Sequence, residues 1–425
     1  RDSIHPSVVA DVLWTPVTKP AYLHPFTSGD VRRDPMRFAR DRILTGTNAI
    51  LDAEVLNTCT NDVIQMIAEP DLDIAPVVMS WEDAIVGIPG NELFPPLNRR
   101  TSPGYGWNKA GGGKAQYFGR DERYILDHPE VIARRDEYLE RLKSGERLCV
   151  KWEDSLKDER RPIEKANLGK TRMFSIGCQV YTVLFRQYFM AFVAQVTKGR
   201  IENEIAVGTN VYSYDWDRIA HRMRSKGTKV LAGDFSNYDG TLNAEMMWKV
   251  LEVIEAFYDD GEENKMIRRL LWCDIVYSIH VNGPYCYMWT HSNPSGCPIT
   301  TVLNSVYHCI AVRYVYVKCA RAAGMMGTMK SYRNNVAFIC YGDDDLWNIS
   351  EMAADWLNMN TITEAFKELG MVYTDETKSG EDVGFRTLEE VRFLKRAFRF
   401  DEESGRVRAP LDIMVVREMP SWIRG

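Results

Sequence analysis

Residues 341–345, Tyr-Gly-Asp-Asp-Asp, stand between two apolar runs, and this arrangement constrains the fold more than any other stretch of the chain. The run before it is 336–340 (Val-Ala-Phe-Ile-Cys), and the run after it is 346–349 (Leu-Trp-Asn-Ile). Two β-branched and aromatic runs separated by a glycine-containing turn predict a β-hairpin. Such a hairpin carries two or three carboxylates at its tip, where their mutual repulsion favours a divalent metal ion.

A plainer interpretation of the same residues is an ordinary surface turn. Asp and Gly are favoured in turns, and exposed acids at the edge of a sheet discourage it from pairing with another chain. The choice between a solvated turn and a metal-binding tip therefore depends on the residues that accompany the hairpin elsewhere in the chain.

The composition is that of a globular protein large enough for two or three hydrophobic cores. The chain has 425 residues, of which 45% are hydrophobic and 26% charged. No apolar stretch is long enough to cross a bilayer and no signal peptide opens the sequence, so we expect no membrane anchor of its own. The first residue is Arg1, which suggests release from a longer precursor. The nine cysteines form no Cys-x-x-Cys pair and lie mostly in apolar runs, which predicts buried thiols in a reducing compartment.

The net charge of −6 argues against a surface coated with basic side chains. Positive charge is instead concentrated between residues 157 and 172, where six Lys and Arg residues accompany three acids. A basic stretch interrupted by Pro and Gly suits a β-ribbon that lies over a triphosphate, with Arg supplying bidentate contacts. A solvated charged loop is the alternative for any one of these residues. The candidates are Lys157, Arg161, Lys165, Lys170 and Arg172.

A second acidic motif follows a predicted strand. Residues 229–234 (Lys-Val-Leu-Ala-Gly-Asp) predict a short buried strand that ends in Asp234, and Asp239 follows five residues later. If this strand lies beside the hairpin, Asp234 meets Asp343 across neighbouring strands. Two carboxylates so placed can hold two Mg²⁺ ions about 4 Å apart, the arrangement used in phosphoryl transfer. The alternative is that either Asp caps the N-terminus of a helix.

A third motif, Ser-Gly-Cys-Pro-Ile-Thr, runs from Ser295 to Thr300 at the start of a predicted long helix. Gly296 lets the backbone approach a ligand closely, and Thr300 and Asn304 share a helical face because they are four residues apart. These small polar groups are suited to reading a ribose 2′-hydroxyl through Asp239. A capped helix whose polar stripe faces solvent is the alternative.

Taken together, these motifs resemble those of the RNA-dependent RNA polymerases of picorna-like positive-strand RNA viruses, and the resemblance covers most of the chain. In that family the basic stretch, Asp-x4-Asp, Ser-Gly-x3-Thr-x3-Asn and Gly-Asp-Asp are motifs F, A, B and C, which stand here in the same order. Residues 101–105 are similar to motif G, 374–378 to motif D and 393–396 to motif E. The wording at 234–240 and 157–162 further resembles the insect-virus branch, including the iflaviruses.

The resemblance implies an α+β fold of the right-hand polymerase type, with fingers and a palm whose antiparallel sheet is backed by helices. It assigns the fingers, with an N-terminal index-finger segment, to residues 1–212, the palm to 213–260 and 286–395, and a return to the fingers to 261–285. Residues 396–425 would lead towards a thumb. Because the helical thumb of the family is longer than this remnant, we expect either that the chain is truncated or that the thumb is largely absent.

The implied activity is template-directed transfer of a nucleotide from a nucleoside triphosphate to the 3′-hydroxyl of an RNA or protein-linked primer. Asp234, Asp343 and Asp344 would be catalytic and bind Mg²⁺, for which Mn²⁺ substitutes, and Lys378 would act as general acid. The implied partners are RNA template and primer, nucleoside triphosphates, a genome-linked viral protein primer and other viral replication proteins. Replication would take place in the host-cell cytoplasm, at membrane-associated complexes reached through those partners.

The resemblance also assigns contacts with template and primer. These residues are Thr101, Ser102, Gly296, Lys395 and Arg396. The hairpin departs from the family by a third acid, Asp345, which we expect to face away from the metals because side chains alternate along a strand.

Two other functions stay open on the sequence. A reverse transcriptase also carries paired aspartates on a hairpin, but the Ser-Gly-x3-Thr-x3-Asn motif argues against it, as does the polar Asp239 in place of a bulky aromatic that would exclude ribose. A non-catalytic RNA-binding or replication-scaffold protein would keep the acids for structural reasons. It would bind RNA without Asp343 and incorporate no nucleotide with any metal.

Overall fold

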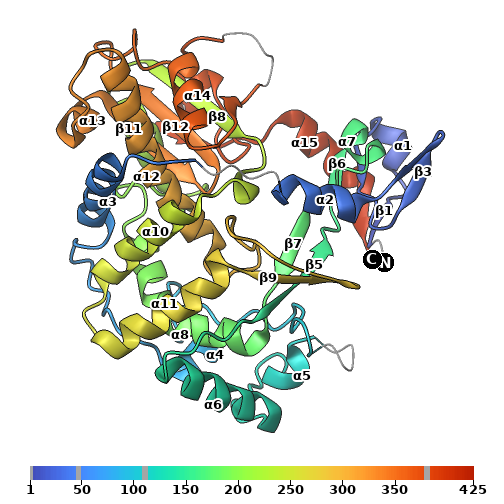
Figure 1. Ribbon diagram of the computed structural model, residues 1–425. Coiled ribbons are helices and arrows are strands. Elements are labelled where there is room, and N and C mark those ends of the chain that lie inside the picture. Colours follow the sequence, from blue (N-terminus) through green and yellow to red (C-terminus); the bar gives the residue numbers. More distant parts are fainter. Residues whose placement is uncertain (1–2, 45–48, 108–112, 378–382) are drawn as a thin grey trace.

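The computed structural model describes residues 3–44, 49–107, 113–377 and 383–425. Within these ranges, two four-stranded sheets and the helices around them form a main body, and a smaller terminal part extends from it (Figure 1). Helices and mainly antiparallel sheets are mixed along the chain, so the predicted α+β class is confirmed.

The central sheet is antiparallel, with the strand order β11–β12–β8–β13. Its strands are β8 (Lys229–Phe235), β11 (Val336–Tyr341), β12 (Asp344–Ile349) and β13 (Tyr373–Asp375). β11 and β12 form the predicted hairpin, in which Tyr341 pairs with Asp344 so that Gly342 and Asp343 make a two-residue turn. Gly342 has a φ of +65°, a left-handed conformation that glycine adopts without steric cost.

Helices cover the central sheet (Figure 1). The long helix predicted after Ser295 is α12 (Thr300–Ala322), which is buried along most of its length and packs against β11. The helices around it are α3 (Ala53–Ile67), α10 (Ala244–Phe257), α13 (Met329–Asn335) and α14 (Met359–Glu368). Because α12 is buried on nearly every side, its few polar side chains must find partners inside the protein.

The second sheet has the order β10–β9–β5–β7, in which β5 and β9 are parallel and the other pairs antiparallel. Its strands are β5 (Lys151–Leu156), β7 (Met173–Ile176), β9 (Ile279–Asn282) and β10 (Tyr285–Met288). Trp152 of β5 packs edge-on against Tyr181, and its indole N–H donates to the Asp274 carbonyl at 3.0 Å. The helices of this region are α4 (Trp81–Val86), α5 (Ala115–Phe118), α6 (Pro129–Lys143), α8 (Gln179–Lys198) and α11 (Glu262–Val276).

The terminal part brings the two ends of the chain together (Figure 1). β1 (Ile4–Pro6) pairs with β16 (Trp422–Arg424), and β2 (Thr18–Pro20) pairs with β6 (Arg160–Pro162) inside the basic stretch. The N-terminal segment therefore pairs with the C-terminal strand β16 and with β6 of the basic stretch. The other elements of the terminal part are α1 (Ala10–Leu13), β3 (Phe26–Ser28), β4 (Val31–Arg33), α2 (Pro35–Leu44), α7 (Ile163–Asn167), α15 (Ile413–Glu418) and the 3₁₀ helix η3 (Met419–Ser421).

The remaining elements are short and lie in the main body. They are α9 (Asp215–Arg222), the 3₁₀ helices η1 (Tyr238–Gly240) and η2 (Leu388–Glu390), and the paired strands β14 (Arg399–Asp401) and β15 (Arg406–Arg408). α9 packs against both β11 and β15, so it links the central sheet to the strand pair β14–β15.

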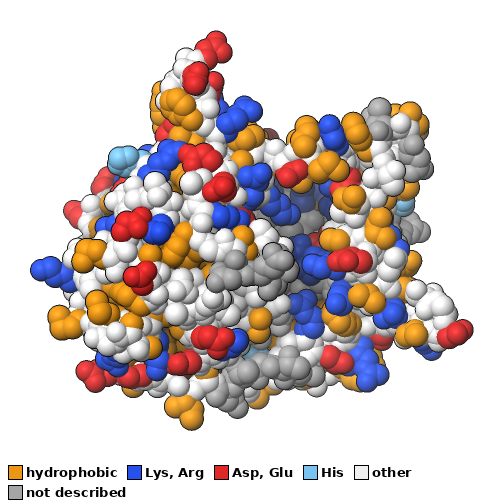
Figure 2. Space-filling model, turned by 90° about the horizontal axis from the view of Figure 1, so that it is seen from above, with side chains coloured by type: hydrophobic (Ala, Val, Ile, Leu, Met, Phe, Trp, Pro, Cys, Tyr) orange, Lys and Arg blue, Asp and Glu red, His pale blue; other side chains and the backbone are white. Residues whose placement is uncertain are grey.

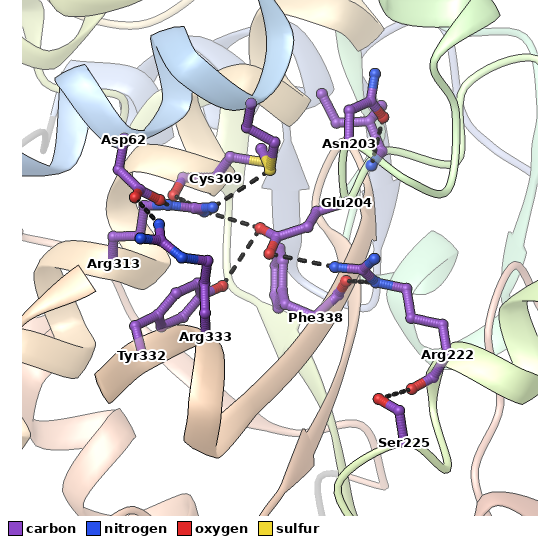
Figure 3. Close-up of polar contacts among 12 residues, drawn as sticks. Asp62, Asn203, Glu204, Arg222, Ser225, Cys309, Arg313, Tyr332, Arg333 and Phe338 are labelled. Carbon is purple, nitrogen blue, oxygen red and sulfur yellow. Dashed lines mark hydrogen bonds and ion pairs between the residues drawn. The ribbon is translucent and has the colours of Figure 1, made fainter. Parts of the chain in front are cut away.

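A buried cluster of ion pairs lies beside β11, the edge strand of the central sheet (Figure 3). Arg313 of α12 is 1% exposed and donates to Asp62 of α3 at 2.7 Å and to Glu204 at 2.8 Å. Glu204 also accepts from Arg222 of α9 at 3.3 Å. Backbone hydrogen bonds of 2.9 and 2.8 Å join the loop that carries Glu204 to Cys340 of β11. The cluster therefore ties three helices and a loop to the strand that leads into the acidic turn.

Most of the thiols are buried, as predicted, and all nine are free; Cys149 and Cys286 are exposed and Cys273 is half-buried. None of the helices in the described ranges combines the length and the apolar character that crossing a membrane requires.

Candidate active site

Asp234 and Asp343 come together at one end of the central sheet. β12 lies beside β8 with Asp345 opposite Gly233, which brings the end of β8 next to the turn of the hairpin. Both acids line a cleft of about 600 Å³, together with Asp239. The helix-cap alternative for Asp234 is wrong, because Asp234 lies within β8.

The cleft disfavours negative charge on its own acids. Burial raises the pKa of Asp343 above its usual range, and the nearby Asp234 adds to the shift, against the opposing charge of Arg172. Burial also raises the pKa of Asp239, against the hydrogen bond that it accepts from Asn304. Buried carboxylates that repel one another are stabilised in their ionised form by a cation. The acids at this end of the sheet therefore have the electrostatics of a cation site.

The two acids that follow the turn have different surroundings. Asp344 lies outside the lining of the cleft, and its Oδ2 accepts the Leu394 N–H at 2.6 Å. Burial, with smaller contributions from the neighbouring carboxylates, raises the pKa of Asp344 to about 7. Asp345 is fully buried and accepts the Gly233 N–H at 3.1 Å and the Tyr373 hydroxyl at 2.9 Å. Asp345 therefore points into the core, as the alternation along the strand predicts.

Asp239 is held by α12. Asn304 donates to Asp239 Oδ1 at 2.7 Å, and Asn293 donates to Asn304 Oδ1 at 3.0 Å. The cap alternative for Asp239 is wrong, because it lies in η1 while Asn243 caps α10. The alternative of a polar stripe facing solvent is also wrong at Asn304, which is buried. Asp239 is thus held in place by α12 while it lines the cleft.

Ser295 and Thr300, the two other predicted residues near the start of α12, have different surroundings. Ser295 lines the cleft. The Thr300 hydroxyl donates to the carbonyl oxygens of Ser295 and Cys297, at 3.2 and 2.9 Å, and so fixes the turn that precedes the helix. Thr300 therefore acts on the shape of the Ser295–Gly296 turn, and its hydroxyl hydrogen is engaged there.

Four of the five predicted basic residues line the same cleft as the acids: Arg161, Lys165, Lys170 and Arg172. Figure 2 shows Lys and Arg side chains gathered along a hollow between the main body and the terminal part. The guanidinium of Arg172 also pairs with Glu159, with Nε donating to Oε1 at 2.7 Å. Lys157 stands outside the lining, although its charge opposes the rise in the pKa of Asp239. The basic stretch therefore faces the acidic end of the sheet across one cleft.

Sequence reasoning missed several residues of the cleft, and two of them bear directly on the site. Arg42 of α2 lines it, and burial, then the charges of Arg161 and Arg172, lower the pKa of Arg42. Asn293 lines it as well and orients Asn304. The only signal for Asn293 was its place two residues before Ser295. No signal pointed to Arg42, because α2 reaches the cleft through tertiary contacts of the N-terminal segment.

Thr101 and Ser102, which the resemblance assigns to template and primer, lie outside the lining of the cleft. Thr101 Oγ1 accepts from Lys114 Nζ at 2.9 Å, and burial lowers the pKa of Lys114 to about 8. Ser102 precedes a close contact between backbones, in which a side chain on Gly104 would meet the Gly177 carbonyl. The structure thus places Thr101 and Ser102 in a tightly packed loop beside the start of α8.

Lys395 and Arg396 lie in a tight turn next to Asp344. Leu394 and Lys395 both have positive φ values, +53° and +60°, and the backbone of Phe393 pairs with that of Arg396. Arg396 donates to the Ala409 carbonyl at 2.6 Å and to the Tyr212 hydroxyl at 3.2 Å. This turn is thus coupled to the hairpin through the Leu394 N–H. Lys378, the predicted general acid, lies outside the described residues.

Gly296 is the point at which the motif touches the second sheet. A Cβ at this position would lie 1.8 Å from the Ser175 carbonyl oxygen of β7. We expect Gly296→Ala to push the Ser295–Gly296 turn away from the cleft and to cost about 1–3 kcal/mol of stability. For the primer extension that the resemblance implies, we expect a fall of at least about tenfold, the equivalent of about 1.4 kcal/mol at the reacting groups.

The measurement for Gly296→Ala compares extension rates and thermal unfolding with those of Gly90→Ala. Gly90 has a positive φ of +75° but open space around it, so this control carries backbone strain without the clash. Equal losses of extension in the two variants would contradict the role of the close contact.

The chemistry of the acidic side chains in the cleft shows whether they suit a metal ion. Among the residues that the structure describes, no three His, Cys, Asp or Glu side chains converge as they would in a closed protein site. Mg²⁺ is commonly bound through one or two carboxylates, with waters and substrate phosphates completing its octahedron. Asp234 and Asp343 provide two hard oxygen ligands in an open, partly basic cleft. These residues fit a Mg²⁺ ion that arrives with a phosphate substrate.

Comparison with known proteins identifies the family of this chain. A family model described as viral RNA-dependent RNA polymerase matches residues 13–425. The replicase polyprotein of Acute bee paralysis virus is 43% identical over 359 residues, which cover 82% of this chain and 19% of the polyprotein. That of Cricket paralysis virus is 40% identical over 443 residues, covering 98% of this chain and 25% of the polyprotein. The chain thus spans about a fifth to a quarter of the length of these relatives.

A solved structure described as Sicinivirus 3Dpol RNA dependent RNA polymerase shares the fold, with a TM-score of 0.80 at 20% sequence identity. The match covers 100% of this chain and 84% of that one. It confirms the polymerase fold that the motif order implied. The family model extends over nearly the whole chain, and both viral relatives are well above 30% identity. The chain belongs to the viral RNA-dependent RNA polymerase family.

Proposed function

We propose that this chain extends an RNA strand by adding ribonucleotides to a primer 3′-hydroxyl on an RNA template. The supporting observation is one cleft in which Asp234 and Asp343 face Arg161, Lys170 and Arg172. The 3′-oxygen would bond to the α-phosphorus of the nucleoside triphosphate as the bond to pyrophosphate breaks and the hydroxyl proton leaves. Phosphoryl transfer of this kind depends mostly on positioning and on stabilising negative charge, which the cleft supplies.

The acidic and the basic side chains of the cleft would have different roles. Asp234 and Asp343 would hold Mg²⁺ or Mn²⁺, and Asp344 would support the hairpin that carries one of them. A bound ion acts as a Lewis acid towards phosphate oxygens. The basic residues would bind the triphosphate and neutralise its charge, with Arg as a bidentate donor. These basic residues are Lys157, Arg161, Lys165, Lys170 and Arg172.

Ribose would be read by Asp239, with Asn304 holding it and Ser295 beside it. A site that hydrogen-bonds a substrate hydroxyl discriminates strongly against the analogue that lacks it. We expect Asp239→Ala to lower the ratio of kcat/KM for a ribonucleotide to kcat/KM for the matching deoxyribonucleotide by about tenfold or more. The control is Asp259→Ala, which removes an exposed acid and should leave the ratio unchanged.

Primer extension with ribo- and deoxyribonucleotides tests the proposal against its two alternatives. A wild-type chain that prefers deoxyribonucleotides would indicate a reverse transcriptase. A chain that binds RNA and incorporates neither nucleotide with Mg²⁺ or Mn²⁺ would be an RNA-binding or scaffold protein. Extension with a preference for ribonucleotides, reduced in Asp239→Ala, is the result that the proposal requires.

We further propose that residues 1–212 and 261–285 act as fingers, 213–260 and 286–395 as palm, and 396–425 as the approach to a thumb. The central sheet falls within the two palm segments. This division is supported by β9, which lies within residues 261–285 and pairs with β5 of the second sheet.

The proposed partners follow from the same activity. They are RNA template and primer, nucleoside triphosphates, a genome-linked viral protein that provides a priming hydroxyl, and the other replication proteins of the polyprotein. The proposed place of action is the host-cell cytoplasm, at membrane-associated complexes to which those proteins recruit the chain.

A further inference from the structure

Two side chains of α12 hold the backbone of the turn in the acidic hairpin. Ser305 Oγ accepts the Gly342 N–H at 2.8 Å, and His308 Nδ1 lies 2.9 Å from the Gly342 carbonyl oxygen. Because a carbonyl oxygen only accepts, Nδ1 carries a proton and donates it. One helix therefore engages both polar groups of Gly342, immediately before the acid that lines the cleft.

His308 is itself held in one orientation. Its side chain is fully buried, and its ring centroid lies 5.1 Å from that of Phe235 and 5.2 Å from that of Phe338. Nε2 lies 3.0 Å from Asp345 Oδ2. Turning the ring would break the hydrogen bond at Nδ1 and the approach of Nε2 to Asp345, which is attractive when both ring nitrogens carry a proton. The Gly342 carbonyl, the aromatic neighbours and Asp345 thus hold the ring in one direction.

Asp345 connects the two backbone segments that carry the acids of the cleft. Its Oδ1 accepts the N–H of Gly233, the residue before Asp234, at 3.1 Å. Its Oδ2 faces His308, which holds Gly342, the residue before the second acid. One buried carboxylate therefore links the neighbour of one cleft acid to the neighbour of the other.

We propose that His308 and Asp345 are positioning residues that set the spacing of Asp234 and Asp343, and with it the affinity of the cleft for a divalent cation. The inference rests on the proposed function, in which those two acids hold the metal. Groups that orient metal ligands from behind commonly contribute about tenfold to a hundredfold in affinity or activity. The third acid of the hairpin is thus part of the support of the site.

Two substitutions of His308 separate its two contacts. In His308→Asn the side-chain amide replaces Nδ1 and can still donate to the Gly342 carbonyl, whereas in His308→Gln the amide reaches the position of Nε2 and Asp345. If the turn is held through Nδ1, His308→Asn should stay within about threefold of wild type in Mn²⁺ affinity, and His308→Gln should lose about tenfold or more.

The affinity is measured directly from the EPR signal of free Mn²⁺, without turnover, and kcat for primer extension is measured beside it against metal concentration. The matched control is Gln195→Leu, which removes a buried side chain whose amide donates to the Ile67 and Pro70 carbonyls at 3.0 and 2.8 Å, neither of which belongs to the hairpin. It should lower the melting temperature and leave Mn²⁺ affinity unchanged. Equal Mn²⁺ affinities for His308→Asn and His308→Gln would overturn the proposal.

A double-mutant cycle tests whether Asp345 acts through His308. Asp345→Asn alone should weaken Mn²⁺ binding about tenfold, and in the His308→Asn background, which lacks the imidazole, it should weaken it no further. Additive losses would mean that Asp345 acts separately, and they would overturn the pairing.

A milder variant keeps the test decisive if the His308 variants fail to fold. Ser305→Ala removes the other bond to Gly342 and should also weaken Mn²⁺ binding about tenfold, whereas an unchanged affinity would contradict the role of the turn. A wild-type chain that binds Mn²⁺ but extends no primer would refute the proposed polymerase activity. The comparison of Mn²⁺ affinities among the variants would still decide the positioning role.

Discussion

Replacement of Asp343 by Asn is expected to slow ribonucleotide incorporation by about a thousandfold or more, because a metal ion at this site contributes several kcal/mol of charge stabilisation. Asp343 stands in the turn of the hairpin, lines the cleft with Asp234, and has a pKa raised by burial. Asn has nearly the same shape and no charge. The variant therefore removes the electrostatic partner of the cation and leaves the packing of the turn in place.

Asp344→Asn provides the matched comparison on the neighbouring residue. The Asp344 carboxylate lies outside the cleft lining and accepts the Leu394 N–H, a bond that the Asn carbonyl can keep. Weakening a charge-assisted hydrogen bond to a neutral one costs about 1–2 kcal/mol, so incorporation should fall about tenfold. The two adjacent substitutions should therefore differ by about two orders of magnitude in rate.

The measurement is the rate of single-nucleotide addition to an annealed RNA primer at saturating substrate, with Mg²⁺ and then Mn²⁺. Melting temperatures of both variants show whether they remain folded. Equal losses in the two variants would contradict the assignment of Asp343 and Asp234 as the metal pair. Full activity of Asp343→Asn would remove the hairpin from the chemistry altogether.

The parts of the site that the sequence predicted are those built from local patterns. The hairpin follows from two apolar runs and a glycine that tolerates φ of +65°, and Asp234 lies one residue before the end of a short apolar strand. Their meeting could be anticipated because acids at the ends of adjacent strands lie at one edge of a sheet. Motif order then supplied the fold class, which depends on the succession of elements.

The parts that the sequence did not predict depend on tertiary contacts. Arg42 enters the cleft from an N-terminal helix, and Asn293 reaches Asn304 across a turn. The cap interpretation of Asp239 failed because Asn243, a few residues later, caps the helix instead. The partner of Asp345 could not be found either, since a buried histidine on a distant helix has no distinguishing pattern along the chain.

Replacement of Arg313 by Met is expected to be the most destabilising change outside the cleft. Arg313 is 1% exposed and pairs with Asp62 and Glu204, so its removal leaves two buried carboxylates with fewer partners. Breaking a buried ion pair by removing one member typically costs about 3–5 kcal/mol. Glu204 also has a positive φ of +65°, and its loop bonds to Cys340, so the loss should be felt in the hairpin.

Hydrogen–deuterium exchange of the peptide containing residues 336–349 measures the loss of stability within the hairpin itself. A local loss of about 3–5 kcal/mol corresponds to exchange faster by about two to four orders of magnitude. The control is Arg218→Met, whose partners are Glu202, 75% exposed, and Asp215, which keeps Arg200. An exposed pair contributes about 1 kcal/mol or less, so exchange should be little changed. Unchanged exchange in Arg313→Met would show that β11 is held by its sheet partners alone, and that the ion-pair cluster behind it stabilises only the helices.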